Sequence, residues 1–371
     1  MMNTIALLFS PIQWIFIGLV VTLLLLISLY QLIVYSRPVR LRHKASKEEG
    51  RDWPSVSVVL YVTNKYKMLR RTLPNLLEQD YPCYEVVVVN DRSEDNSDIL
   101  LRTLQEQYPH LQVRTTSTDD RFGRSPSIAI GMGIRAAQYD AILCIEADCK
   151  IKDNQWIRSM SAPYGGKTEV VLGHTTHYKC PLLKRCDCLQ HALAYLGRAA
   201  IGRPYTGVGS NVLFKKSLFY DNNGFNVRLT REHSPLRVFI GEVVKRNNCG
   251  ICVQPSGVTH FHMRMDRHQR KLFRKMERRS LRLNPKAPKY PMLFESSLRL
   301  LFYLLTFSAI ALFYHRLGLL LFFCSLLFLR LLSVTLLYVR VRKKMEEKGL
   351  AIPFLLWDIL FPFVNLYRVF G

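Results

Sequence analysis

Apolar residues are concentrated in long runs near the two ends of the chain. Three runs are almost uniformly apolar: about Ile12–Val34, Leu298–Tyr314 and Leu317–Tyr338. As helices, such runs are long enough to cross a bilayer core of about 30 Å. A fourth run, Ile352–Phe370, is interrupted by Asp358, Asn365 and two prolines. These interruptions predict an interfacial or re-entrant segment there.

The middle of the chain alternates between short apolar runs and segments with helical spacing. Buried strands are predicted at 55–62, 85–89, 111–115 and the run that begins at Ala141. Helices are predicted between them at 68–77, 99–107 and 128–137. Strands that alternate with helices form a mostly parallel sheet, and its ligands gather beyond the carboxyl ends of the strands. The pattern therefore predicts an α/β domain between the apolar ends.

Charge adds a membrane surface to this prediction. The chain has 52 Lys and Arg against 28 Asp and Glu, a net charge of +24, and 49% hydrophobic residues. Nucleic acid is the competing explanation for such basicity, but the apolar runs favour an anionic membrane. Basic clusters follow the first run (Arg37–Lys47) and the third (Arg340–Lys344), which marks both ends as cytoplasmic. We expect a multi-pass protein of the cell (inner) membrane, with the main domain in the cytoplasm.

The N-terminal run is predicted to be a membrane helix that stays in place. No Lys or Arg precedes it and no small-residue cleavage site follows it, so a removable signal peptide is not expected. The nine cysteines then lie in the cytoplasm or the membrane, where disulfides are rare. Cys180, Cys186, Cys188, Cys249 and Cys252 are candidate zinc ligands, but their spacing fits no common zinc module, and buried free thiols are the alternative.

Acidic residues follow two of the predicted strands. Asp91 follows the second strand, and Glu146 and Asp148 follow the strand that begins at Ala141. Carboxylates at one edge of a parallel sheet can bind Mg²⁺ or Mn²⁺, which takes its remaining oxygens from a diphosphate. Ordinary solvated acids are the alternative. Two acidic positions at one edge favour a site.

The order of these parts resembles the family 2 glycosyltransferases, whose nucleotide-binding fold is called GT-A. The resemblance covers residues 55–275. It rests on the following segments: Val58–Lys65, Leu76–Pro82, Val88–Asp95, Gly123-Arg124 with the helix at 128–137, Glu146-Ala147-Asp148, Gly207–Phe214 and Gly224-Phe225. It implies a GT-A domain that transfers a sugar from a nucleotide-diphosphate donor, with a UDP-sugar as the expected donor.

The resemblance also divides the chain into parts. We expect an N-terminal transmembrane helix (1–35), a basic linker (36–54), a cytoplasmic glycosyltransferase domain (55–295), two transmembrane helices (296–340) and a final basic turn with an interfacial or re-entrant segment (341–371). Within the middle domain we expect a nucleotide-binding half (55–150), an acceptor half (151–262) and a basic interfacial segment (263–295).

The resemblance assigns the nucleotide and metal residues. Asp91 corresponds to the acid that accepts a hydrogen bond from the base, with a turn acid or helix cap as the alternative. Asn64 and Arg124 lie where the family contacts the nucleotide, although a structural role for Arg124 is an equal alternative. Asp148 would hold the metal. Glu146 stands where the family more often has Asp, which alters its ribose or metal contact.

The catalytic base is assigned to Glu242. The family takes a base from an acidic pair about ninety residues after the metal motif, but Glu242 is followed by two valines instead of a second acid. A glutamate at a helix start that faces solvent or pairs with Lys245 is the alternative. Glu232 and His233 lie nearby as substitutes.

A basic segment after the acceptor half completes the candidate site. Gln269, Arg270 and Phe273 fall where related synthases have Gln-x-x-Arg-Trp, and Leu272 replaces the arginine, which argues against a processive synthase. The segment is expected either to hold the diphosphate as a lid or to lie on anionic lipid. His260 is a further candidate metal ligand, with a structural histidine as the alternative.

The predicted function is an inverting, metal-dependent transfer of a sugar to a lipid-linked or saccharide acceptor. Direct displacement needs no covalent nucleophile, and none stands out in the sequence. A catalytically degenerate, membrane-bound scaffold is the alternative, because the metal, base and Gln-x-x-Arg-Trp motifs all differ from the family's. Nucleic acid is not expected as a partner, and whether the protein has protein partners is not determined by the sequence. Finally, Arg330 inside an apolar run is expected to pair with Asp358.

Overall fold

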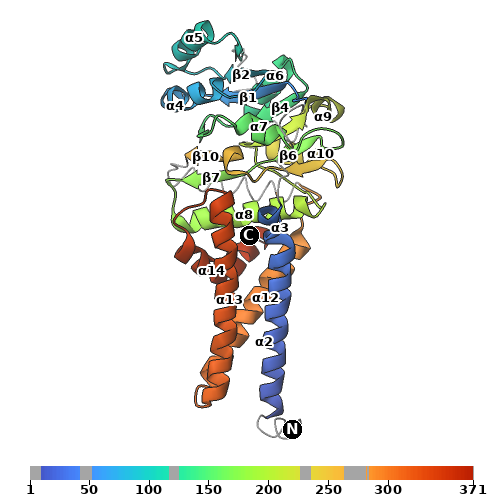
Figure 1. Cartoon of the computed structure of the whole chain (residues 1–371), viewed down its shortest axis with the longest axis vertical. Coiled ribbons are helices and arrows are strands. Elements are labelled where there is room, and N and C mark those ends of the chain that lie inside the picture. Colours follow the sequence, from blue (N-terminus) through green and yellow to red (C-terminus); the bar gives the residue numbers. More distant parts are fainter. Residues whose placement is uncertain are drawn as a thin grey trace.

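The computed structural model describes residues 10–41, 52–116, 125–225, 235–262, 281 and 284–370 of the 371-residue chain. Figure 1 shows an elongated molecule with an α/β part at one end and long helices at the other. The N-terminal helix starts at the far end of the helical part, and its other end meets the α/β part (Figure 1).

A seven-stranded sheet forms the centre of the α/β part. Its order is β3-β2-β1-β4-β8-β6-β9. The strands are β1 (Val56–Val62), β2 (Tyr84–Asn90), β3 (Leu111–Thr115), β4 (Ala141–Cys144), β6 (Val170–Leu172), β8 (Val212–Lys215) and β9 (Cys249–Ile251). The first four are parallel, and β8 runs antiparallel to both β4 and β6. The predicted mostly parallel α/β sheet is confirmed.

Both faces of this sheet are buried, which explains the continuous apolar runs in its strands. Along β1, Val59 contributes to one hydrophobic core, whereas Val58 and Leu60 contribute to another core on the opposite face. On the first face Gly133 lets a helix approach closely, because an added Cβ there would lie 2.6 Å from a methyl of Val59. The helix in question is α6 (Pro126–Ala136).

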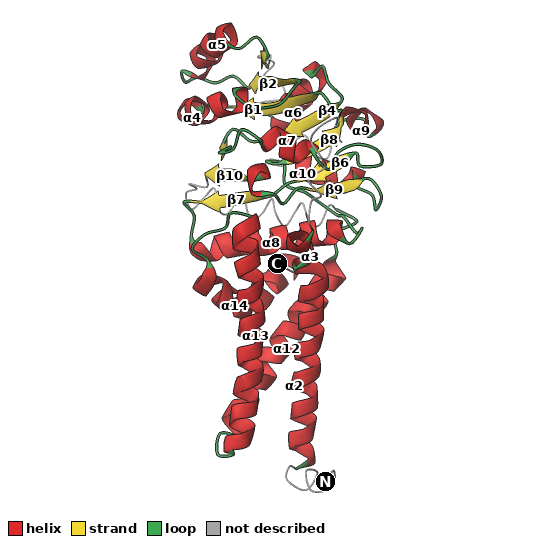
Figure 2. Cartoon of the chain, viewed as in Figure 1, coloured by secondary structure: helices red, strands yellow, loops and turns green. Residues whose placement is uncertain are grey.

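The other helices of this part are α4 (Tyr66–Leu77), α5 (Ser97–Gln107), α7 (Trp156–Ser161), α8 (Leu182–Ala200), α9 (Lys216–Asp221) and α10 (Pro235–Val243). A second sheet of three short strands has the order β5-β10-β7. Its members are β5 (Cys149–Lys150), β7 (Thr175–Tyr178) and β10 (Thr259–His262). Figure 2 shows α8 between these sheets and the long helices. Helix α8 therefore forms the junction between the α/β part and the helical part.

Four helices in the described residues are long and apolar enough to cross a membrane. They are α2 (Pro11–Tyr30) with its five-residue π-helical continuation η1 (Gln31–Tyr35), α12 (Lys289–Leu312), α13 (Leu317–Lys344) and α14 (Ala351–Phe370). Helix α12 begins before the predicted apolar run at Leu298, because its first turns carry polar residues that pack inside the bundle.

Helix α14 has two different faces. Phe354, Trp357 and Phe361 are buried, whereas Leu356 and Leu360 are exposed. In Figure 1 it lies beside the upper part of α13, close to α8, and not along the whole bundle. Length and composition qualify it as a fourth crossing. The expected interfacial or re-entrant position stays a prediction.

The predicted pair of Arg330 and Asp358 is confirmed. Two guanidinium nitrogens of Arg330 donate to the Asp358 carboxylate over 2.6 and 2.9 Å. Arg299 donates to the same carboxylate over 2.8 Å and Tyr303 over 2.5 Å, and Arg330 also donates to the Gln31 side chain over 2.8 Å. These contacts join four helices through buried polar groups, which satisfies charges that would be costly in an apolar bundle.

Candidate functional site

The carboxyl ends of three central strands meet at one edge of the large sheet. Val62 of β1 is in register with Asn90 of β2, and Val59 of β1 with Cys144 of β4. Asp91 therefore leaves β2 at the edge where Glu146 leaves β4. The chain reverses just beyond β4, where the Cys149 amide donates to the carbonyl of Glu146 over 2.9 Å. The sequence-predicted acids thus share one rim.

Asp91 is held rigidly at this rim. Its side chain is buried, and its Oδ1 accepts a hydrogen bond of 2.7 Å from the Thr116 hydroxyl. The Arg92 guanidinium lies 3.7 Å from the same oxygen. The backbone amide of Asp91 donates to the Val62 carbonyl over 2.8 Å. A carboxylate fixed in this way can accept a hydrogen bond from a nucleotide base without further ordering.

Asn64 connects the loops that follow β1 and β2. Its side-chain oxygen accepts from the Glu94 amide over 2.7 Å, and its own amide donates to the Ser93 hydroxyl over 3.1 Å. The residue has a φ of 51°, in the left-handed region where Asn is tolerated better than most residues. Asn64 therefore shapes the rim, and its nucleotide contact stays a prediction.

A small pocket opens at the same rim. It is lined by Val59, Leu60, Tyr61, Ile130, Ile145, Glu146, Gly209, Pro235 and Leu236. Glu146 is the acid in this otherwise largely apolar lining. Burial, and then the charge of Asp148, raise the pKa of Glu146 to about 7, against the opposing charges of Arg237 and Lys65. At neutral pH the carboxyl group is thus close to half-protonated, and a cation that bound here would displace the proton.

Three acids converge on Tyr61, which lies in β1 beneath the rim. Burial raises the pKa of Tyr61 far above its usual range, and the charges of Glu146, Asp148 and Asp91 add to this, in that order. Asp91, Glu146 and Asp148 thus all lie near enough to Tyr61 for their charges to act on its pKa. This convergence is the central electrostatic feature of the site.

Asp148 already has a cationic partner. The Lys65 ammonium donates to its Oδ2 over 2.8 Å, and the Asp148 side chain is 26% exposed. The contact joins the loop after β1 to the loop after β4, which lie 83 residues apart in the sequence. Sequence reasoning missed it, because Lys65 carries no signal besides its place after a strand.

The acids suit a hard divalent cation, although they do not form a complete cage. No group of three or more His, Cys, Asp or Glu that could hold a metal occurs within the described ranges. This also gives no support to the candidate zinc site, whose five cysteines form no disulfide. Mg²⁺ commonly uses one or two carboxylates and takes its other ligands from phosphates and water. Glu146 and Asp148 fit that mode of binding.

His260 is buried and has contacts at both ring nitrogens. The Thr176 hydroxyl lies 2.7 Å from Nδ1, and Glu346 Oε2 lies 3.0 Å from Nε2. Burial is the main reason that the pKa of His260 is lowered to about 4, so the ring is neutral at physiological pH. Metal binding by His260 would require one of these contacts to break, and that role stays a prediction. Glu346 reaches the ring from the loop between α13 and α14.

Glu242 lies near the end of α10, whereas the first residues of that helix line the pocket. Its Oε2 accepts from the Asn222 side chain over 3.1 Å, and its carbonyl accepts from Lys286 Nζ over 2.7 Å. Seven residues separate it from Pro235, which corresponds to about 10 Å along a helix. Pro235 lines the pocket and Glu242 does not.

Six predicted residues lie outside the described part of the chain. They are Arg124, Glu232, His233, Gln269, Arg270 and Phe273. Their roles stay predictions. The structure adds Arg237, whose charge acts on Glu146 from the first turn of α10. Its only sequence signal is that it is a basic residue five positions before the candidate base, Glu242.

Comparison with known proteins agrees with this geometry. Residues 57–220 match the profile of the family described as Glycosyl transferase family 2. This segment is a family 2 glycosyltransferase domain. The fold is GT-A: a mannosyltransferase from Pyrobaculum calidifontis, solved in complex with GDP-Man and Mn²⁺, superposes with a TM-score of 0.56 at 15% identity. The superposition covers 95% of this chain and 98% of that one.

The curated relatives match shorter parts of this chain. A poly-β-1,6-N-acetyl-D-glucosamine synthase from Staphylococcus epidermidis is 26% identical over 127 residues, which are 34% of this chain and 29% of the relative. The synthase of the same name from Staphylococcus aureus (strain COL) is 25% identical over 173 residues, which are 45% of this chain and 40% of the relative. The chain thus matches less than half the length of these relatives.

Proposed function

We propose that this family 2 domain is an inverting, divalent-cation-dependent glycosyltransferase. It moves a sugar from a nucleotide-diphosphate donor, a UDP-sugar, to a lipid-linked or saccharide acceptor. The observation that carries the proposal is the convergence of Asp91, Glu146 and Asp148 on Tyr61 beside the pocket. Two of these acids suit a cation, which the diphosphate of a sugar nucleotide would also bind. The third acid suits the N–H of the nucleotide base.

The names of the similar proteins support the same reaction class. One is a mannosyltransferase that binds GDP-Man and Mn²⁺, and the others are synthases of an N-acetylglucosamine polymer. The metal, bound by Glu146 and Asp148, would neutralise charge on the departing diphosphate. Asp91 is positioned by Thr116 to hold the base. Lys65 supplies a further positive charge next to Asp148.

The transfer itself is a single displacement. The acceptor oxygen attacks the anomeric carbon from the face opposite the diphosphate, and the new C–O bond forms as the bond to the diphosphate breaks. The hydroxyl proton passes to a carboxylate base. Glu242 is the predicted base, but its contact with Asn222 and its distance along α10 from Pro235 make Glu232 a necessary comparison.

The membrane part of the proposal places this reaction at the cytoplasmic face. Four helices of suitable length and composition, and basic clusters at the predicted inner ends of α2 and α13, support that position. A reporter fused after the last residue of α13, compared with one in the turn between α12 and α13, would test the orientation. Cytoplasmic signal from the turn would contradict it.

The decisive experiment is nucleotide release by the purified full chain in detergent. UDP-sugars and GDP-Man are compared with and without Mn²⁺ or Mg²⁺. Asp148→Ala should lower turnover by at least a hundredfold, whereas Asp140→Ala, an exposed acid at the other end of β4, should leave it unchanged. Wild-type turnover in Asp148→Ala would contradict the metal assignment.

The base assignment needs its own pair of variants. Glu242→Gln and Glu232→Gln are compared for turnover and for donor binding. The variant that loses turnover by about a hundredfold or more while it still binds donor identifies the base. Equal, near-normal turnover in both would exclude both residues.

A second candidate is a binding protein without turnover. The observation that favours it is the Lys65–Asp148 ion pair, which already compensates the charge of the acid expected to hold the metal. Calorimetry with UDP separates the two functions. Binding without sugar transfer or donor hydrolysis for any donor would favour the scaffold.

A further inference from the structure

Arg198 is a buried cation without a counter-ion in the part of the chain that the structure describes. It lies near the end of α8 and is 6% exposed. Its Nη2 donates to the Tyr30 hydroxyl over 2.9 Å, while its Nε has no hydrogen-bond partner. A buried charge paired only with a neutral hydroxyl is unfavourable, because the hydroxyl does not replace the solvation that the charge has lost. Such a cost is relieved when an anion binds.

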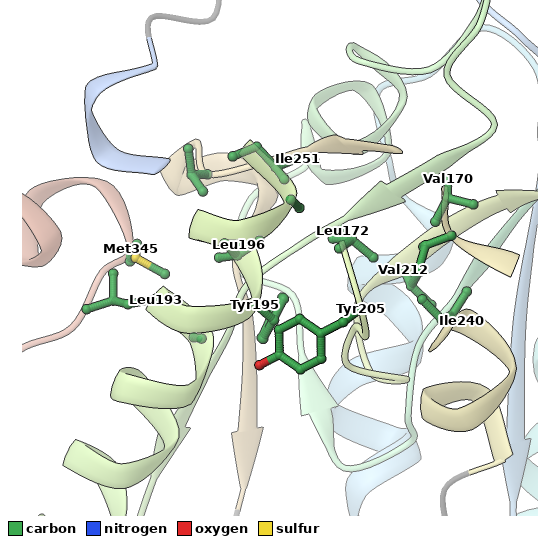
Figure 3. Packing of buried hydrophobic residues seen from close by; sticks show 14 of the residues in the cluster. Val170, Leu172, Leu193, Tyr195, Leu196, Tyr205, Val212, Ile240, Ile251 and Met345 are labelled. Atoms are coloured by element: carbon green, nitrogen blue, oxygen red, sulfur yellow. The ribbon is translucent and has the colours of Figure 1, made fainter. Parts of the chain in front are cut away.

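A second unsatisfied donor lies in the same region. The Tyr205 side chain is 2% exposed, and its hydroxyl has no partner among the described residues. Figure 3 shows its ring beside Tyr195, with the oxygen directed away from Val212 and Ile240. Burial raises the pKa of Tyr205 to about 12, so the hydroxyl keeps its proton at neutral pH. It is therefore a hydrogen-bond donor without an acceptor.

The charges of three arginines, Arg198, Arg237 and Arg368, act against the burial that raises the pKa of Tyr205. Arg237 is also placed near this segment by a contact, because the Thr206 hydroxyl lies 3.4 Å from its carbonyl oxygen. Arg368 is neutralised by Asp187, at 2.5 Å. Arg237 is half-buried, its Nε has no partner, and no ion pair with a described carboxylate is formed. Among the described residues, Arg198 and Arg237 therefore form no direct ion pair with a carboxylate.

The remaining nearby carboxylate does not cancel these charges. Glu295 acts on Tyr205, but it is bound by Arg299 and accepts a hydrogen bond of 2.5 Å from Tyr35. Arg237 also acts on Glu146 of the pocket. The cluster thus adjoins the pocket on one side without being part of its lining.

The cluster lies where the α/β part meets the N-terminal apolar helix. Tyr30, the partner of Arg198, is the last residue of α2. One turn further on, Val34 packs so closely on α8 that a Cβ at Gly197 would overlap its carbonyl oxygen. Figure 2 shows this junction at the upper end of α2, beneath the sheets. If α2 crosses the membrane, the junction is at the level of lipid headgroups.

We propose that Arg198, Tyr205 and Arg237 form a binding site for a phosphate group, carried by a membrane lipid. Two guanidinium groups and one neutral hydroxyl match the oxygens of a phosphate monoester. The position at the inner end of α2 favours a lipid headgroup over free phosphate. The site depends on the charges of this cluster and does not rest on the proposed transfer reaction.

The test uses the purified full chain in neutral detergent. The probes are phosphatidic acid, diacylglycerol as the matched lipid without phosphate, and inorganic phosphate. The variants are Arg198→Gln, which can keep the contact with Tyr30, and Tyr205→Phe, which removes only the hydroxyl. Arg203→Gln, an exposed arginine five residues beyond Arg198, is the matched control.

Phosphatidic acid should bind wild type and the control equally, and diacylglycerol should bind far more weakly. Arg198→Gln should weaken binding about tenfold or more, and Tyr205→Phe severalfold. Equal binding of phosphatidic acid and diacylglycerol, or identical affinities for Arg198→Gln and Arg203→Gln, would overturn the site. Inorganic phosphate that binds as tightly as phosphatidic acid, with the same dependence on Arg198, would overturn the lipid source.

The melting temperature without ligand tests whether the Arg198→Gln variant is folded. Because Arg198→Gln removes an uncompensated buried charge, its melting temperature without phosphate should equal or exceed that of wild type. Phosphatidic acid should then raise the melting temperature of wild type more than that of the variant. A large loss of stability in Arg198→Gln without ligand would show that the guanidinium has a structural role, which contradicts the proposal.

Discussion

Replacing Glu146 by Gln should stabilise the metal-free protein while it removes cation binding. In the folded chain the pKa of Glu146 is about 7, against the usual 4.5. The folded state therefore binds a proton more tightly than the unfolded state, and stability is lost as the pH rises from about 4.5 through 7. The difference between these values corresponds to at most about 3 kcal/mol.

The cause is local and is removed by the substitution. Burial disfavours the carboxylate, and the charge of Asp148 adds to the effect, while Arg237 and Lys65 oppose it. Gln has nearly the same shape and no charge. At pH 5 the variant and wild type should thus have similar free energies of unfolding. At pH 8 the variant should be more stable by about 2–3 kcal/mol.

The assay is unfolding of the full chain in detergent with a chelator present, followed at pH 5 and pH 8. Glu106→Gln, an exposed glutamate on α5, is the control and should show no such dependence. Mn²⁺ binding, measured separately by calorimetry, should be strong at pH 8 in wild type, weaker below pH 7, and much reduced in Glu146→Gln. A variant that is less stable than wild type at pH 8, or a difference independent of pH, would refute the reasoning.

Three further predictions concern other contacts. Lys65→Met should increase the affinity for Mn²⁺ alone and weaken the binding of UDP without metal, each by severalfold in calorimetry. The reason is that the Lys65 ammonium competes with the cation for Asp148 but attracts phosphate. Unchanged affinities for both ligands would exclude this role. Arg330→Leu and Asp358→Leu should each lower the free energy of unfolding by about 3 kcal/mol or more. The double variant should lose less than the sum of the two single losses. Strict additivity would argue against a coupled pair. Gly197→Ala should lower the melting temperature, because its methyl would overlap the Val34 carbonyl; an unchanged melting temperature would show that the helices separate easily.

Local patterns were sufficient for the candidate acids but not for their partners. Asp91 and Glu146 could be assigned to one rim because parallel strands place their carboxyl ends together. The pair of Arg330 and Asp358 could be predicted because an isolated charge in an apolar helix requires a partner. The contact of Lys65 with Asp148 had no comparable signal, since a lysine after a strand is common on any surface.

The orientation of α10 is a second feature that could not be predicted from the sequence. Spacing along the chain favoured Glu242 as the base, but spacing does not give the direction in which a helix leaves the pocket. The structure places Pro235 in the pocket lining and ties Glu242 to Asn222 instead. The reach of Glu346 to His260 was also unpredictable, because the two residues belong to different parts of the chain.

The sequence by itself determined the apolar helices, the α/β alternation and the acids at the strand ends. These features depend on periodicity and on chain geometry, which act over a few residues. Only the tertiary structure decided which charges have partners. Asp148 has Lys65, whereas among the described residues the Arg198 guanidinium pairs with no carboxylate and the Tyr205 hydroxyl has no hydrogen-bond partner. Charge compensation depends on distances of a few ångströms between residues far apart in the chain, and those distances exist only after folding.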